Sequence, residues 1–171
     1  ESTTPKTGSR INDIITNPSL TDQDIVYTVT PTSLSIFGTC VGDPFTVTIT
    51  IHPEPASVNV VDNTCSDVAL AHNLQADITN GLATNFLWVA AGNANVVGES
   101  VVPQAGAIID DVLTNVSGVD QNVVYTITPT DATFGCAGDP FTVTVTVYSE
   151  PDANNVVDNT CSDVEIGRAH V

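Results

Sequence analysis

The chain has 171 residues, enough for one or two small domains with hydrophobic cores, and its formal net charge is −17 at pH 7. Its basic side chains are Lys6, Arg10 and Arg168, too few to neutralise phosphates, so nucleic-acid binding is excluded and binding to anionic membrane surfaces is disfavoured. No apolar run reaches about 18 residues, which excludes direct membrane insertion. The many carboxylates favour solubility or, in part, the binding of Ca²⁺.

Short strands with period-two alternation are expected along the chain. Residues 45–51 form one such strand, and Pro53-Glu54-Pro55 follows as a stiff, extended linker. Beyond it, alternation and turn residues predict strands at residues 58–61, 68–74, 85–90, 95–97, 108–113, 123–128 and 141–148. No stretch has convincing helical periodicity. The predicted fold is all-β, with antiparallel immunoglobulin-like β-sandwich repeats in tandem.

The tandem arrangement is inferred from long segments that repeat. Residues 42–51 return almost letter for letter as 138–147, residues 26–32 correspond to 124–130, and residues 60–68 return unchanged as 156–164. Cys40 and Cys136 are 96 residues apart, and so are Cys65 and Cys161. This period fits one sandwich domain of roughly 100 residues. A two-residue length difference between residues 32–39 and 130–135 predicts a loop there.

The phase of the repeat places the expected domain boundaries. Residues 1–52 are the C-terminal half of a truncated repeat, residues 56–149 a complete repeat, and residues 152–164 the start of a third. Residues 165–171 look like the in-frame translation of a sequencing-library adapter, and are interpreted as a non-native tail. Without the front half of its own domain, the strand at 45–51 is expected to expose its apolar face or to place it against a neighbour, unlike the strand at 141–147.

Over residues 11–164, the chain resembles the PKD-like repeats of very large Bacteroidetes cell-surface proteins, which include adhesins and gliding-associated proteins. The resemblance rests on Thr64-Cys65-Ser66, Trp88 in a mid-domain strand, residues 123–130, Gly135-Cys136-Ala137-Gly138 and residues 140–147. It implies an extracellular or cell-surface location, export by the type IX pathway, and an adhesive or spacer role. It carries no catalytic residues across, because the repeats of this family offer none.

An exported chain with two cysteines in each repeat is expected to form disulfides. Within the complete repeat the pair is Cys65 with Cys136, and this bond would close a loop of about 70 residues and contribute roughly 4 kcal/mol. The rival arrangement joins Cys40 to Cys65 and Cys136 to Cys161 across the linkers, and uses every cysteine. A cysteine metal site is excluded by spacing, since no Cys-x-x-Cys occurs.

Oxygen-bearing side chains gather around the two expected linkers. They are Glu54 and Asp62 at the first, and Glu150, Asp152 and Asp158 at the second. Such ligands beside a stiff joint could hold Ca²⁺ and keep neighbouring repeats in line, and the alternative is a solvated linker. No other cofactor is indicated.

No constellation of catalytic residues is expected. His52 and His72 have no nucleophile at triad spacing, and are interpreted as surface or structural histidines. Asp110 and Asp111 are neighbours on a strand and point to opposite faces, so they cannot form a catalytic dyad. Trp88 is expected in the core, or alternatively at the surface as a sugar-stacking platform.

The favoured function is a structural or adhesive repeat module of a large secreted or cell-surface protein, acting as a spacer or adhesin stalk. Its partners are neighbouring repeats of the same chain, and a surface glycan or protein ligand that the sequence does not identify. The alternative is a carbohydrate-binding accessory module of a secreted hydrolase. That alternative needs an exposed aromatic platform, for which Trp88 and Tyr148 are the candidates.

Overall fold

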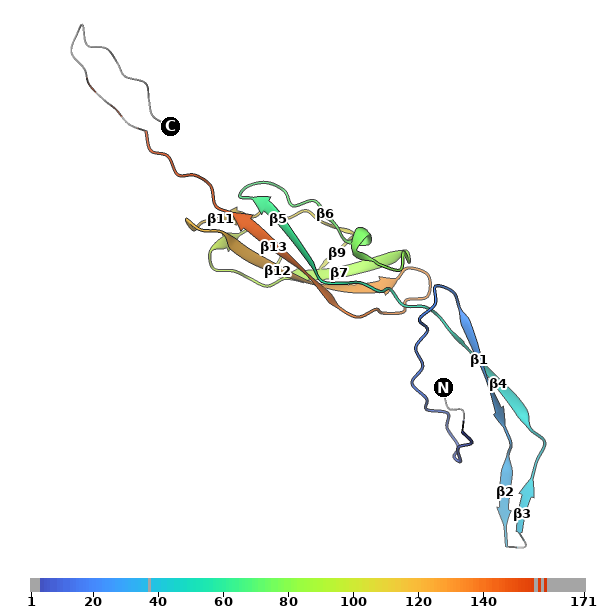
Figure 1. The fold of residues 1–171 in the computed structure, drawn as a ribbon. Helices are drawn as coiled ribbons and strands as arrows, with labels where there is room; N and C mark the ends of the chain where they lie inside the picture. The colour runs from blue at the N-terminus through green and yellow to red at the C-terminus, as the bar shows by residue number, and fades with distance from the viewer. Residues whose placement is uncertain (1–3, 37, 156, 158, 160–171) are drawn as a thin grey trace.

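A computed structural model of the protein describes residues 4–36, 38–155, 157 and 159. Two parts follow one another along an elongated molecule: a narrow two-stranded ribbon, and a wider β-sandwich (Figure 1). No helix in the described part of the chain is long and apolar enough to cross a membrane.

The narrow part consists of two antiparallel strand pairs placed end to end. Its strands are β1 (Gln23–Val29), β2 (Thr32–Ser35), β3 (Gly38–Val41) and β4 (Phe45–Ile51). Strand β1 pairs with β4, and β2 pairs with β3. The sequence predicted a loop at residues 32–39, and that prediction is wrong over most of this segment. The extra residues lengthen a hairpin, which can take two residues at its tip without changing the register of β1 against β4.

The larger layer of the sandwich is a five-stranded sheet in the order β5-β13-β12-β7-β9. Its strands are β5 (Val60–Cys65), β7 (Thr84–Ala90), β9 (Gln104–Ala105), β12 (Gln121–Asp131) and β13 (Phe141–Tyr148). Strand β13 lies between β12, which is antiparallel to it, and β5, which is parallel to it. The parallel pair is an exception to the antiparallel fold that the sequence predicted.

The opposing layer consists of short elements. Strand β6 (His72–Asn73) pairs with β10 (Ile108–Ile109), and β8 (Val96–Val97) pairs with β11 (Thr114–Asn115). A single turn of 3₁₀ helix, η1 (Leu74–Asp77), follows β6 directly. Its N-cap is Asn73, whose side chain accepts a hydrogen bond from the backbone N–H of Gln75 at 3.1 Å. The predicted strand at residues 68–74 is therefore reduced to β6.

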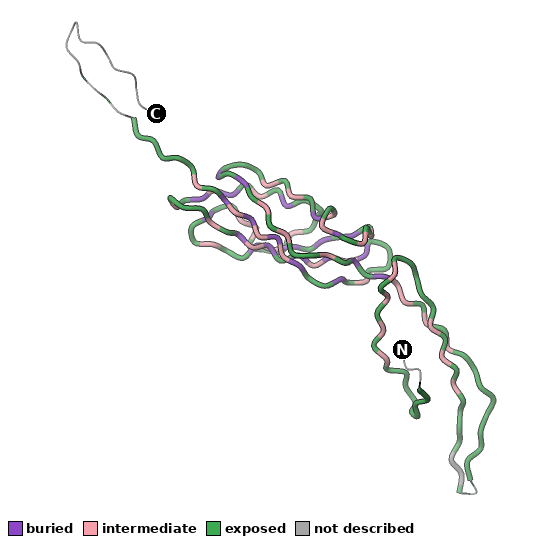
Figure 2. The backbone as a smooth tube through the Cα atoms, viewed as in Figure 1, coloured by how far each residue is buried: buried purple, intermediate pink, exposed green. Residues whose placement is uncertain are grey.

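The core lies between these two layers, and Figure 2 shows most of the buried residues in this part of the molecule. Strand β13 alternates as the sequence predicted, with buried Phe141, Val143, Val145 and Val147 on one face and half-buried threonines on the other. The buried apolar residues from the other strands and loops are Leu74, Ile78, Phe86, Trp88, Ala90, Val96, Ile109, Leu113, Val123, Tyr125 and Ile127. The prediction of an all-β, immunoglobulin-like sandwich is confirmed.

Strand β4 is nearly identical in sequence to β13 but differs in burial. Phe45 is 52% exposed, whereas its counterpart Phe141 is 3% exposed. Val47 and Ile49 are half-buried, whereas Val143 and Val145 are fully buried. The expected exposure of the β4 face is therefore confirmed, because the narrow part has no second layer in the described residues to cover it.

Candidate functional site at the junction of the two parts

The linker between the two parts is packed against the sandwich. Pro53 and Pro55 are both buried, although the sequence predicted only an extended connection. Gly138, in the turn before β13, lies directly under the linker. A Cβ at this position would overlap the carbonyl oxygen of Pro55 and would lie 3.3 Å from Cγ of Pro129. The close approach of the two backbones therefore requires glycine at position 138.

Asn80 fastens the linker from the other side. Its Nδ2 donates to the carbonyl oxygen of Glu54 at 2.8 Å, and its Oδ1 accepts from the backbone N–H of Ala56 at 3.2 Å. The backbone N–H and the hydroxyl of Thr79 both donate to the carbonyl oxygen of Ala56, at 2.8 and 3.1 Å. These bonds satisfy the carbonyl groups of Glu54 and Ala56 and the N–H of Ala56, and fix the path of the linker over the sandwich.

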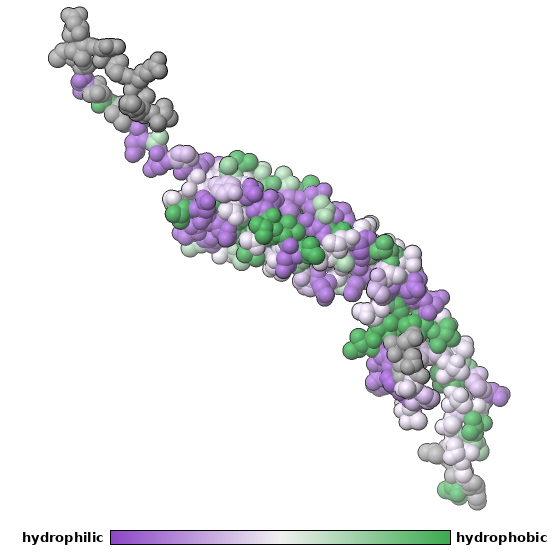
Figure 3. Space-filling view, viewed as in Figure 1, coloured by the Kyte–Doolittle hydropathy of each residue, from purple (hydrophilic) through white to green (hydrophobic). Residues whose placement is uncertain are grey.

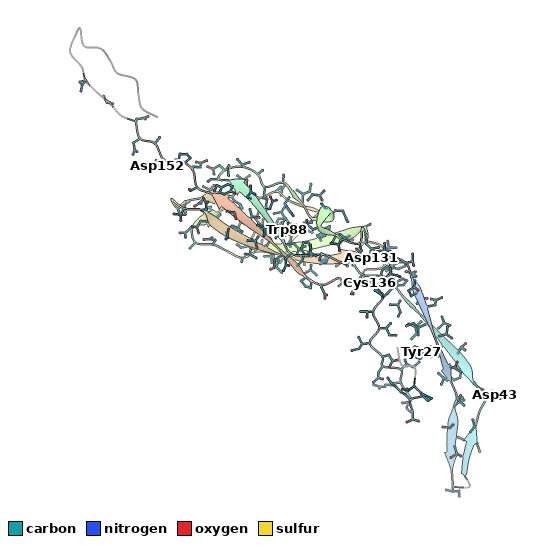
Figure 4. The ribbon with its side chains drawn as sticks, in the orientation of Figure 1. Tyr27, Asp43, Trp88, Asp131, Cys136 and Asp152 are labelled. Carbon is teal, nitrogen blue, oxygen red and sulfur yellow. The ribbon has the colours of Figure 1, made fainter. Side chains whose placement is uncertain are left out.

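An aromatic contact joins the end of the narrow part to a loop of the sandwich. The rings of His52 and Phe134 are stacked, with centroids 3.7 Å apart and planes 8° from parallel. His52 is held by Asp22, whose Oδ1 lies 2.8 Å from its Nδ1. Phe134 is held by buried Asp131, whose carboxylate accepts from the backbone N–H groups of Thr133 and Phe134 at 2.9 and 2.6 Å. Figure 4 shows Asp131 at the end of the sandwich that faces β1.

The same polar contacts recur in the two parts. The hydroxyl of Tyr27 donates to Asp13 at 3.0 Å, and that of Tyr125 donates to Asp111 at 2.8 Å. Asp111 also accepts from the backbone N–H and the hydroxyl of Ser100. Burial, the hydrogen bond to Asp111 and the charges of Asp111 and Glu99 raise the pKa of Tyr125.

A second recurring contact involves an asparagine. Asn17 donates to the carbonyl oxygen of Ile51, at the end of β4, and Asn115 donates to that of Val147, at the end of β13. Each asparagine also accepts from the serine two residues later, Ser19 or Ser117. The two parts are thus built with equivalent local contacts.

The sequence model of one family, described as the PKD-like domain, matches residues 1–55 and 62–151. The chain belongs to the PKD-like domain family. No curated protein matches the chain. PKD-like domains are generally non-catalytic, immunoglobulin-like modules of structural or adhesive character, and they occur in extracellular or surface proteins.

The structure contradicts the disulfide expected within the complete PKD-like unit. Cys65 lies opposite Tyr148 at one end of β13, whereas the carbonyl of Cys136 accepts from Asp131 beyond the other end. The length of β13, about 25 Å at about 3.3 Å per residue, separates the two cysteines, and a disulfide needs Cα atoms within about 7 Å. Cys40, Cys65 and Cys136 are all free. The rival pair Cys40–Cys65 spans even more of the molecule, and Cys161 lies outside the described residues.

The expected calcium ligands at the first linker are also not together. Asp62 lies in the middle of β5, opposite Val145, and its carboxylate binds His72 rather than facing Glu54. No group of three or more His, Cys, Asp or Glu side chains able to hold a metal ion occurs in the described part of the chain. Glu150 and Asp152 are exposed in the segment after β13 (Figure 4), and Asp158 lies outside the described residues. Calcium binding at the second linker stays a prediction.

His72 is the centre of a structural cluster instead. Its Nδ1 lies 2.7 Å from Oδ2 of Asp62, and its Nε2 lies 2.9 Å from Oδ2 of Asp77. A neutral imidazole has one N–H, so only the imidazolium donates to both carboxylates. Burial lowers the pKa of His72, but the hydrogen bonds and charges of Asp77 and Asp62 outweigh that effect and raise the pKa above 6.5. The cluster ties η1 and β6 to β5.

Trp88 is buried, with 4% of its surface exposed, and it meets the ring of Tyr125 edge to face at 5.8 Å. Figure 4 labels it near the middle of the sandwich. It therefore cannot serve as the sugar-stacking platform that the carbohydrate-binding alternative required. Tyr148 is 42% exposed, as expected, but it is a single ring beside the linker.

Sequence reasoning missed the residues that form the junction. Asn80 belongs to an Asn-Gly pair, which by itself indicates only a turn, and Phe134 lies in the segment of unequal length between the repeats. One signal was present: Gly138 and Gly42 occupy the same place in the repeated Gly-Asp-Pro-Phe motif. Its meaning depends on the approach of Pro55, which no local pattern contains.

Proposed function

We propose that this chain is a structural spacer of a large secreted or cell-surface protein, in which tandem PKD-like repeats hold a binding tip away from the cell. It has no catalytic role in this proposal. The ligand at the tip is a surface glycan or protein, and the other partners are neighbouring repeats. The threonine-rich outer face of β13 and the net charge of −17 keep such arrays soluble and separate from one another.

The packed junction is the observation that carries the proposal. A spacer must keep its two ends at a defined separation. Freely jointed linkers do this poorly, because the units that they join sample many separations. Here Pro53 and Pro55 are buried, Asn80 holds the backbone of the linker, and His52 stacks on Phe134. The elongated arrangement in Figure 1 fits the same function.

Distance measurements across the junction test the proposal. Spin labels on the exposed Cys40 and Cys65 report on the two parts in a chain that also carries Cys136→Ser and Cys161→Ser. We expect one narrow distance distribution by pulsed electron resonance. The matched chain with Pro53→Gly and Pro55→Gly should give a broad distribution, because both stiff residues are lost. A distribution equally broad in both chains would reject the spacer function.

A further inference from the structure

Asn80 and Gly81 are the only Asn-Gly pair in the sequence, and they lie in the turn that holds the linker. Asparagine is a thermally labile side chain. It is most reactive before glycine, because glycine has no Cβ to obstruct attack of its backbone nitrogen on the side-chain amide. Gly81 is exposed, and no atom of the described structure outside its chain neighbours lies within 4 Å of the position that a Cβ would take. The pair is therefore open to water.

The reaction of such a pair is deamidation through a cyclic imide. The backbone nitrogen of Gly81 forms a bond to Cγ of Asn80, the bond from Cγ to Nδ2 breaks, and the N–H proton of Gly81 leaves with Nδ2 as ammonia. Water then opens the imide, at Cγ to give aspartate or at the backbone carbonyl to give isoaspartate. The net reaction consumes water and releases ammonia, so it needs no oxidant, reductant or cofactor.

Both reacting groups are held in the packed junction. Nδ2 of Asn80 donates to the carbonyl oxygen of Glu54 at 2.8 Å, and Oδ1 accepts from the backbone N–H of Ala56 at 3.2 Å. The backbone N–H of Gly81 donates to the carbonyl oxygen of Ile78 at 3.3 Å. Attack requires the amide to turn towards Gly81 and the N–H to give up its proton, so these bonds must break first. Because the linker holds both ends of the amide, its departure is the opening step.

The product cannot hold the linker as Asn80 does. Aspartate has no N–H, so the carbonyl oxygen of Glu54 loses its donor and faces a carboxylate oxygen in the same place. The reaction also adds a negative charge to a chain whose net charge is already −17. Isoaspartate lengthens the backbone of the turn by one carbon atom as well, which moves the turn relative to the linker. The ammonia is lost to solvent, so the change is not reversed.

We propose that Asn80 and Gly81 form a self-modification site, whose deamidation permanently releases the linker from the sandwich at a rate that linker packing controls. Figure 3 shows the surfaces of the two parts in contact at the junction, which is the closed arrangement. Reaction proceeds from the fraction of molecules whose linker has opened locally. The junction thereby keeps a permanent record of how often its linker has opened. The inference goes beyond the spacer function, because it concerns a covalent change and the lifetime of the junction.

Peptide mass spectrometry of the full chain measures the rate of deamidation at Asn80 during incubation at mildly alkaline pH. Pepsin at low pH provides the peptides, since trypsin has no site between Arg10 and Arg168. We expect slower deamidation in the folded chain than in the same chain unfolded in guanidinium chloride. Replacing Pro53 and Pro55 by glycine should accelerate the reaction of the folded chain about tenfold, which corresponds to about 1.4 kcal/mol less favourable closing of the junction.

The same digest contains an internal control. Asn59 is exposed but precedes Val60, whose branched side chain obstructs attack, so its amide should persist in every sample. Circular dichroism checks that the double-glycine variant folds, and the comparison with guanidinium chloride needs no variant. Equal rates at Asn80 in the folded and unfolded chain, or in wild type and the folded double-glycine variant, would overturn the proposal.

A variant that carries the product tests the release of the linker. Asn80→Asp should broaden the distance distribution between spin labels on Cys40 and Cys65. The matched control is Asn73→Asp, which adds the same charge close by but keeps its hydrogen bond, because Asn73 accepts from the backbone N–H of Gln75. This control should give the wild-type distribution. A wild-type distribution in Asn80→Asp, or equal broadening in the two variants, would overturn the proposal, since the lost donor would then not be what frees the linker.

Discussion

The imidazole of His52 lies flat against the ring of Phe134, with their centroids 3.7 Å apart, and this contact bridges the two parts of the chain. The imidazole of His52 is bound by Asp22, and the backbone N–H of Phe134 is bound by Asp131. The stack therefore joins an imidazole with a side-chain partner to a ring on a loop whose backbone is held, which limits the conformational freedom lost when the two rings meet.

Removing this stack should loosen the junction. His52→Ala is expected to lose about 0.5–1.5 kcal/mol of contact energy between the parts, the usual range for an aromatic pair. The distance distribution between spin labels on Cys40 and Cys65 should broaden. Phe134→Tyr keeps a flat ring in the same place and should retain the wild-type distribution. An unchanged distance distribution in His52→Ala would mean that the buried prolines fix the orientation of the two parts without the aromatic stack.

The two equivalent glycines provide a matched pair of substitutions. Gly138→Ala places a methyl group on the carbonyl oxygen of Pro55, a backbone atom that cannot move without displacing the linker, and should cost about 1–3 kcal/mol. Gly42→Ala meets Cγ of Pro31 at 3.0 Å, a side-chain atom that can shift, and should cost less. Thermal unfolding measures the difference. Equal losses of stability in the two variants would show that the close approach of the linker to residue 138 does not affect stability.

Strand β13 and the exposure of β4 could be predicted from the sequence because both depend on local alternation and on the repeat. The parallel partner of β13, strand β5, could not be predicted in this way. Only Val60 of the three inward-facing residues of β5 is apolar, and the other two are Asp62 and Thr64. They are satisfied by His72 and by the carbonyl oxygens of Cys65 and Val68, which no alternation pattern anticipates. The strand predicted at residues 58–61 therefore begins and ends later in the structure, at Val60–Cys65, and its parallel pairing with β13 was not predicted.

Two substitutions of Trp88 separate its volume from its polar group. Trp88→Ala should cost about 3–5 kcal/mol, as for other large buried side chains. Trp88→Phe should stay within about 1.5 kcal/mol of wild type, because the buried indole N–H has no hydrogen-bond partner in the described structure and its loss removes a desolvation penalty. Urea unfolding followed by far-UV circular dichroism measures both variants, since Trp88 is the only tryptophan. A large loss in Trp88→Phe would indicate that the N–H is bonded in solution.

The His72 cluster predicts a specific dependence of stability on pH. Because Asp77 and Asp62 raise the pKa of His72 in the folded chain, its stabilising effect is fully present below the unfolded pKa of about 6.5. It is lost as the pH rises through the higher, folded pKa. The difference in unfolding free energy between wild type and His72→Asn should therefore shrink with increasing pH across this window. Asp77→Asn should weaken the dependence of the unfolding free energy on pH. A difference between wild type and His72→Asn that is constant with pH would contradict the positive charge assigned to His72 in the cluster.

The junction shows why the candidate site was less predictable than the fold. The prolines at 53 and 55 predicted a stiff connection, which stays a prediction, and the residues that hold the linker in place, Asn80 and Phe134, are distant in sequence and lie in turns. The acidic residues near the linkers suggested a metal site because sequence proximity was taken for spatial proximity. An extended strand carries Asp62 away from Glu54 and towards His72.

The parallel pairing of β5 with β13 determines how the sandwich bears tension. The chain enters the sandwich at the start of β5 and leaves it at the end of β13, and the two strands run side by side over six residue pairs. A pull on the two ends of the unit draws these strands in opposite directions along their common axis. The hydrogen bonds between them lie across that axis, so they are loaded together in shear rather than opened one at a time. Resistance to stretching is therefore built into the strand order of this sandwich.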